Sequence, residues 1–182
     1  MRILSAGLLF WMLVPPVLSD TGVNDQQKTQ ALTVNATVLK GCILGSGSSD
    51  VTTFGNLSFG QVSSLASNIS IVSSAGAGSV LFRCNPNVSV TLALGLGNNV
   101  TGSLSAGRKL INTLTSETLI YQLYQDSNYS TIWGDGNNGG TTQVVTASGS
   151  TQEIKVYARL FSTSTLPTSG TYSDTVLLTV TY

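Results

Sequence analysis

Serine and threonine hydroxyls are abundant in this sequence, but the groups that would activate them as nucleophiles are missing. Residues 45–49 (GSGSS) superficially resemble the nucleophile elbow of a hydrolase, although the second glycine is misplaced. The 182-residue chain contains no histidine, which removes the base of a Ser-His or Cys-His pair and the commonest metal ligand. We therefore interpret 45–49 as a loop and predict no catalytic residue.

Other stretches with the composition of a ligand site also lack the required spacing. Gly95-Leu96-Gly97 is followed by Val100 where a dinucleotide-binding loop needs its third glycine. Residues 135–139 (DGNNG) carry oxygen ligands but not the alternate spacing and distant glutamate of an EF-hand, so a hairpin turn is predicted. Nothing marks a glycosidase pair among the 8 acidic residues. The sequence predicts no cofactor, no metal site, no small-molecule substrate and no enzyme.

Charge is sparse and balanced. Lysine and arginine number 8, aspartate and glutamate number 8, and charged residues make up 9% of the chain. A nucleic-acid-binding protein needs a basic stripe, so that class is excluded. The abundant Gly, Ser, Thr and Asn suit the exposed faces and turns of β-sheets.

The first 19 residues predict export. After Met1-Arg2 the chain is apolar from Ile3 to Leu18, and residues 17–19 (VLS) suit a cleavage site. The alternative is an N-terminal membrane anchor, but the apolar run is short for a span and contains Pro15 and Pro16. Residues 1–19 are therefore predicted to be a secretory signal peptide. Because export leads to an oxidising compartment, the two cysteines, Cys42 and Cys84, are predicted to form a disulfide.

Period-two alternation of apolar and polar residues dominates the rest of the chain, and no window has sustained helical periodicity. Such a pattern, interrupted by turn residues, predicts an all-β sandwich or barrel. An antibody-type domain would place a tryptophan between its cysteines, whereas Trp133 follows Cys84, so the likeness to an immunoglobulin domain is one of architecture. The predicted strands are 32–38, 51–59, 67–73, 79–84, 88–95, 110–114, 118–125, 130–133, 141–147, 152–161 and 172–182.

The strand predicted for 172–182 stands at the end of the sequence with one apolar face. Asp174 and Leu177 break the alternation. An exposed apolar strand edge invites aggregation, so we expect another protein chain to cover it. The apolar residues that share one parity are Tyr172, Val176, Leu178, Val180 and Tyr182.

Several short motifs, in order, resemble one family. Residues 119–126 contain Tyr121, Leu123, Tyr124 and Asp126, and are followed by Trp133-Gly134-Asp135-Gly136. This pair resembles the "YxLYxD … WGDG" signature of spore coat protein U domain proteins. Residues 81–84 (LFRC), 156–159 (VYAR) and 170–176 (GTYSDTV) are similar to further parts of the pattern, so the resemblance covers 31–182. Within the family, the chain most resembles Csu-type pilins of the archaic chaperone–usher pathway in Gram-negative bacteria.

The resemblance implies an incomplete immunoglobulin-like β-sandwich that lacks its last strand and is completed by a donor strand from another chain. The implied division is a signal peptide (1–19), an N-terminal extension with the donor strand (20–40) and a pilin domain (41–182). Residues 172–182 would border the groove and bind the chaperone. The alternative for the donor segment is an ordinary first strand of the same domain. The expected inserting side chains are Leu32, Val34, Ala36 and Val38.

The function that follows is that of a structural subunit of a surface pilus, which polymerises by donor-strand complementation and supports attachment and biofilm formation. Its implied partners are a periplasmic pilus chaperone, an outer-membrane usher and other pilin subunits. It would pass through the periplasm to the cell surface. The alternative is a secreted monomeric domain for carbohydrate binding or adhesion.

Overall fold

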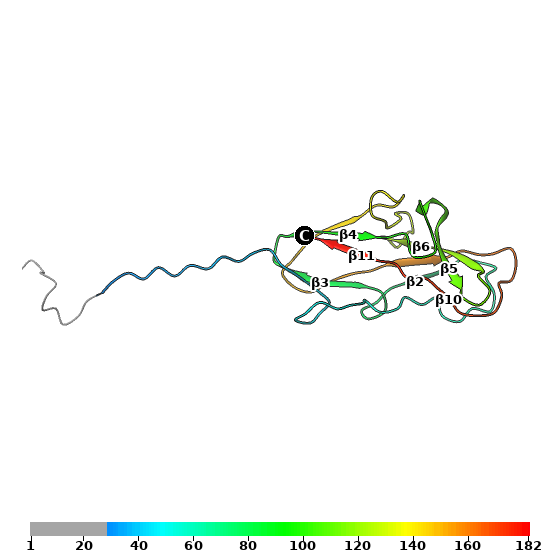
Figure 1. The fold of residues 1–182 in the computed structure, drawn as a ribbon, viewed down its shortest axis with the longest axis horizontal. Helices are drawn as coiled ribbons and strands as arrows, with labels where there is room; N and C mark the ends of the chain where they lie inside the picture. The colour runs from blue at the N-terminus through cyan, green and yellow to red at the C-terminus, as the bar shows by residue number, and fades with distance from the viewer. Residues whose placement is uncertain (1–28) are drawn as a thin grey trace, which may run out of the picture. The chain divides into compact units, whose positions relative to one another are not determined.

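The computed structural model describes residues 29–182, so the predicted signal peptide lies outside the described residues. The chain divides into two units after Thr37. The second unit, Val38–Tyr182, is a β-sandwich (Figure 1). Apart from a single 3-10 turn, η1 (Leu104–Ala106), its regular elements are all strands. The all-β prediction is confirmed.

The sandwich contains three hydrogen-bonded sheets. The first has the order β1 (Cys42–Leu44), β3 (Val80–Cys84), β8 (Gln152–Ile154). The second has the order β10 (Tyr172–Ser173), β5 (Arg108–Asn112), β6 (Thr118–Tyr124), β9 (Tyr157–Leu160), β2 (Ile69–Val72). The third has the order β11 (Leu178–Thr181), β4 (Ser89–Leu94), β7 (Gln143–Thr146).

The first two sheets continue into one another. One edge of β9 pairs antiparallel with β2, and β8 pairs antiparallel with β3. Only Lys155 and Val156 separate β8 from β9. Ser73 N donates to Val156 O at 2.9 Å across this break. Residues 74–78 therefore bulge out of an otherwise continuous pairing, and the β11–β4–β7 sheet forms the second layer.

The core lies between inward-facing side chains that alternate along each strand. Phe82 of β3, Val90 and Leu92 of β4, and Trp133 have no exposed surface. The Trp133 indole is satisfied because Nε1 donates to Leu92 O at 3.1 Å. This period-two burial is the reason the strands could be found in the sequence.

Two predicted strands are wrong: residues 51–59 contribute one isolated bridge (Gly55–Ala77), and residues 130–133 contribute two, through Ile132 and Trp133. Residues 32–38 form no strand within this chain, and their pairing with another chain stays a prediction. Two others are interrupted: 152–161 becomes β8 and β9, and 172–182 becomes β10 and β11. Alternation specifies a buried face, but a strand also needs a backbone partner, which the pattern does not encode.

The disulfide prediction is confirmed. Antiparallel pairing of β1 with β3 places Cys42 directly opposite Cys84, and the two sulfurs are bonded. The bond closes a loop with a sequence separation of 42. In the chain-entropy account, such a loop contributes about 4 kcal/mol to the free energy of unfolding.

We therefore expect the exported protein to take up no thiol-alkylating reagent until it is reduced. Reduction should lower the free energy of unfolding by about 4 kcal/mol. Intact mass after alkylation measures the first quantity and urea denaturation the second. Two alkylated cysteines in the unreduced, secreted protein would contradict the assignment.

Candidate functional site

Strand β11 pairs on one side only. Its partner is β4, with Leu178 opposite Leu94 and Thr181 opposite Thr91, and Figure 1 shows the two strands side by side. Within residues 29–182, no strand pairs with the other side of β11. The backbone N–H and C=O groups on that side are therefore available to another strand.

The inward-facing side chains of residues 172–182, which include β10 and β11, cover the core incompletely. Tyr172, Val176, Leu178 and Val180 all pack against the core cluster, yet each is only half-buried. Tyr182 is 54% exposed. On the neighbouring strand β4, by contrast, Leu92 has no exposed surface. The sandwich is thus less well closed along β11 than along β4.

A second apolar stretch, residues 54–59, belongs to no strand. The side chains of Phe54, Leu57 and Phe59 are half-buried against the core, while Ser58 points outward. Phe54 O accepts from Gly78 N at 2.9 Å, but residues 56–62 make no backbone–backbone hydrogen bond to any described residue. This stretch has the alternation of a strand, and that is why the sequence predicted one here.

Aromatic and polar contacts connect the 54–59 stretch to the segment before β11. The rings of Phe59 and Tyr121 pack edge to face, with centroids 6.4 Å apart. The Tyr121 hydroxyl donates to Asp174 Oδ2 at 2.7 Å. Burial and this hydrogen bond with the carboxylate raise the pKa of Tyr121, so the tyrosine remains a donor at neutral pH. Tyr121 therefore contacts both the 54–59 stretch and the segment that leads into β11.

Asp174 marks the point where the chain crosses between layers. β10 pairs with β5 in one sheet, and β11 pairs with β4 in the other. Asp174 Oδ1 accepts from Asn98 N at 2.8 Å and from Asn99 Nδ2 at 3.1 Å. Sequence reasoning treated Asp174 as a defect in the pattern, although it lies in the quoted 170–176 motif. The carboxylate instead anchors the crossover.

The predicted donor segment has its apolar side chains exposed. Leu32, Val34 and Val38 are 87%, 83% and 82% exposed, and Ala36 is exposed as well. No residue from 29 to 41 belongs to a strand, so the first strand of the sandwich is β1. The assignment of a donor strand to this segment stays a prediction.

The WGDG residues shape a tight loop. Asp135 Oδ1 accepts from the backbone N–H groups of Asn137 and Asn138, each at 2.8 Å. A Cβ on Gly134 would collide with the Asn138 side chain and with the Gly140 backbone. Gly136 takes a positive φ of 89°, which favours glycine. These residues are structural.

The YxLYxD residues also have structural positions. Leu123 lies in the core beside Tyr121. Tyr124 packs edge to face on Tyr129. Asp126 accepts from the backbone N–H groups of Ser130 and Thr131 and so closes the loop after β6.

A buried arginine joins the motif loop to the sheets. Arg108 has no exposed surface, and its guanidinium donates to Gly95 O, Trp133 O and Gln122 Oε1. Burial lowers its pKa to about 10, so it stays charged at neutral pH. Removing one partner of such a network leaves buried polar groups unpaired, which is costly.

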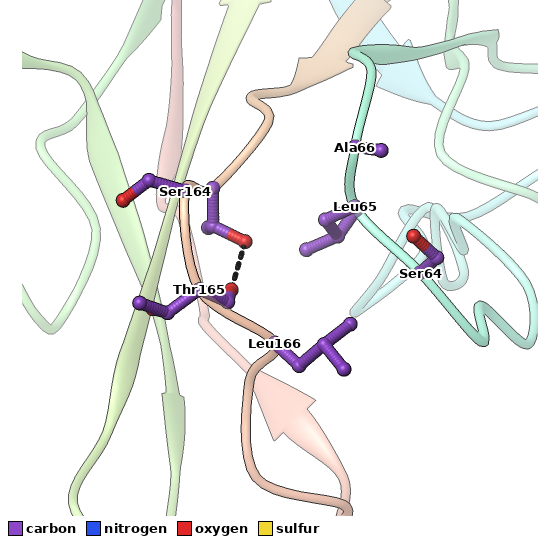
Figure 2. A pocket seen from close by; sticks show the side chains of 7 residues that line it. Ser64, Leu65, Ala66, Ser164, Thr165 and Leu166 are labelled. Atoms are coloured by element: carbon purple, nitrogen blue, oxygen red, sulfur yellow. Dashed lines mark hydrogen bonds between the residues drawn. The ribbon is translucent and has the colours of Figure 1, made fainter.

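One pocket of the described residues lacks ionisable side chains. Figure 2 shows a pocket of about 130 Å³ between residues 64–66 and 163–166, lined by serine, threonine, leucine and alanine alone. Thr163 Oγ1 donates to Thr165 O there at 2.7 Å, and no acid or base is present. No cluster of His, Cys, Asp and Glu in residues 29–182 could hold a metal ion. Over the same residues, no helix is long and apolar enough to cross a membrane.

Comparison with known proteins places the chain in a family. The model of the Spore Coat Protein U domain matches residues 28–179, and the chain belongs to this family. Protein U of Myxococcus xanthus is 32% identical over 158 residues, which cover 85% of this chain and 84% of that protein. The resemblance inferred from the motifs is confirmed.

A solved structure supports the sandwich fold. A chain of the CsuC–CsuE chaperone–tip adhesion subunit pre-assembly complex, from archaic chaperone–usher Csu pili of Acinetobacter baumannii, superimposes with a TM-score of 0.50 at 18% identity. The match covers 80% of this chain and 41% of that one. At this identity, the likeness concerns the fold.

The role of Asp174 can be tested with one substitution. Asp174→Ala should lower the free energy of unfolding by about 2 kcal/mol, because hydrogen bonds to a charged group are lost. Amide exchange at residues 178–181 should accelerate as β11 loosens. The matched control is Asp126→Ala, which should accelerate exchange at 128–131 instead. Unchanged exchange in β11 of the Asp174 variant would contradict its role as an anchor.

Proposed function

We propose that this protein is a structural subunit of a chaperone–usher surface pilus that polymerises by donor-strand complementation. One observation carries the proposal. Within residues 29–182, β11 has a strand edge without a partner, and residues 32–38 form an exposed apolar segment with strand periodicity. The edge of β11 lacks a strand partner and apolar cover, and the 32–38 segment of a second copy could supply both.

The groove would lie between β11 and the 54–59 stretch. An inserted strand would hydrogen-bond to the free side of β11, and its apolar side chains would cover the half-buried Leu178, Val180 and Phe59. Burying each larger donor side chain contributes about 1.5–3 kcal/mol. The burial of Leu32, Val34 and Val38, together with the backbone hydrogen bonds to β11, would oppose the conformational entropy cost of ordering the segment.

Donor and groove are different surfaces of one subunit, so the contact is heterologous. Repeated head to tail, such a contact produces an open filament rather than a closed dimer. The subunit therefore needs temporary cover for its groove before it reaches the fibre. We assign that step to a periplasmic chaperone, and the assembly step to an outer-membrane usher and other pilin subunits.

Family and fold support this assignment. The structural neighbour is itself part of a complex between a chaperone and a pilus subunit. Export through the predicted signal peptide would bring the chain to the periplasm, and assembly would bring it to the cell surface. Support of attachment and biofilm formation is the biological role proposed for the fibre. The protein is proposed to act without enzymatic activity.

The donor strand can be tested by charge substitution on each of its faces. Val34→Asp with Val38→Asp should abolish fibres, because burying an unpaired carboxylate costs several kcal/mol. The complex with the chaperone should survive. Thr33→Asp with Thr37→Asp changes the opposite face and should leave fibres intact. Electron microscopy of cells counts fibres, and co-purification measures the chaperone complex. Loss of chaperone binding in the valine variant would contradict the donor assignment.

The groove can be tested on the two faces of β11. Leu178→Asp should eliminate both the chaperone complex and the fibres, because this side chain packs against the core. Thr179→Asp is the matched control, since its side chain is exposed on the other face of the same strand. Equal effects of the two substitutions on chaperone binding would contradict a groove on the Leu178 face.

A further inference from the structure

We propose that the Cys42–Cys84 disulfide shields the acceptor groove from tension on the subunit's own N-terminal extension. The inference rests on the proposed function, in which the extension is held by one neighbour while the groove holds another. Any pull along such a fibre enters the sandwich where the extension joins it, at Gly41. The residues around Gly41 decide which part of the sandwich receives that force.

The disulfide is the first covalent cross-strand connection that the force meets. Cys42 is the first residue of β1 and lies opposite Cys84, the last residue of β3. Immediately before it, Gly41 N donates to Asn85 Oδ1 at 2.6 Å, and Asn85 N donates to Gly41 O at 3.0 Å. The covalent bond thus stands at the end of β1 from which peeling would begin.

Without that bond, the route of the force would lead to the groove. β1 has three residues and lies at a sheet edge, paired with β3 alone. A pull on its first residue strains its hydrogen bonds one after another, and each contributes only about 1 kcal/mol. Beyond β1 comes the stretch with little backbone pairing, which contains Phe54, Leu57 and Phe59. Peeling would therefore remove one border of the proposed groove.

With the bond, the force bypasses that stretch. It passes through the sulfurs to Cys84 in β3, which pairs with β1 on one side and β8 on the other and carries the fully buried Phe82. Residues 43–83 lie inside the covalent loop, so the pull on the extension does not reach them along the backbone from Cys42. The subunit keeps its grip on one neighbour while the other pulls.

The test uses assembled fibres, so that folding and export are complete before the bond is changed. A cleft of about 350 Å³ is lined by both cysteines and, among others, by Arg83 and Pro86, so a small phosphine is the reductant of choice. The chain has 2 cysteines, so reduction changes one bond per subunit. Alkylation and mass measurement then give the reduced fraction. Fibres are stretched in optical tweezers before and after reduction.

Reduced fibres should lengthen in steps before they break, and break at lower force than oxidised fibres. The released loop has a sequence separation of 42, so each step should reach up to about 140 Å. Oxidised fibres should show no such steps. If the bond resists the reductant, fibres of the Cys42→Ser, Cys84→Ser variant replace the reduced sample. Oxidised Asn85→Ala fibres are the matched control and should behave as wild type, because the covalent bond carries the force.

Two results on intact fibres would overturn the proposal. Identical traces before and after verified reduction would show that the bond carries no tension. Dissociation of reduced fibres at rest would show that it maintains the groove without tension. In both cases the pilus function stands, because fibres have formed. Absence of any fibre from the wild-type protein would instead contradict the proposed function, and this inference with it.

Discussion

The open edge of β11 is the constraint on which the rest of the structure depends. Its free backbone groups need hydrogen-bond partners, and the half-buried side chains on its inner face need apolar cover. A small apolar ligand would supply only the cover, and water supplies only the hydrogen bonds. A strand with alternating apolar side chains supplies both at once. The edge therefore favours an extended peptide segment as its partner over a small ligand.

Several polar contacts keep that edge in place. Asp174 fixes the crossover into β11 through Tyr121, Asn98 and Asn99. Arg108 connects the carbonyl groups that follow β4 and precede the 134–140 loop. Asp174, Tyr121 and Trp133, which belong to the family's sequence motifs, therefore hold the segments around the β11 edge in position.

Sequence periodicity predicted much of the fold and one face of the site. The alternation in 172–182 agrees with the partial burial of Tyr172, Val176, Leu178 and Val180, whereas Tyr182 is exposed. The disulfide was predicted because the chain has only two cysteines and is expected to be exported to an oxidising compartment. The 54–59 stretch was predicted as an ordinary strand because alternation carries no information about a missing partner. The role of Asp174 was missed because its partners lie 53 to 76 residues away in sequence.

In the proposed assembly, side-chain size can set the register that backbone pairing leaves open. A slip of one residue would turn Thr33, Asn35 and Thr37 toward the core and is excluded by their polarity. A slip of two residues keeps the same face inward and must be excluded by shape. Ala36 is the one small side chain between Val34 and Val38, so a slip by two would place a valine where alanine fits and alanine where a valine is needed. Both errors are costly in a packed interior, and a chain with net charge of zero has little electrostatic steering to correct them.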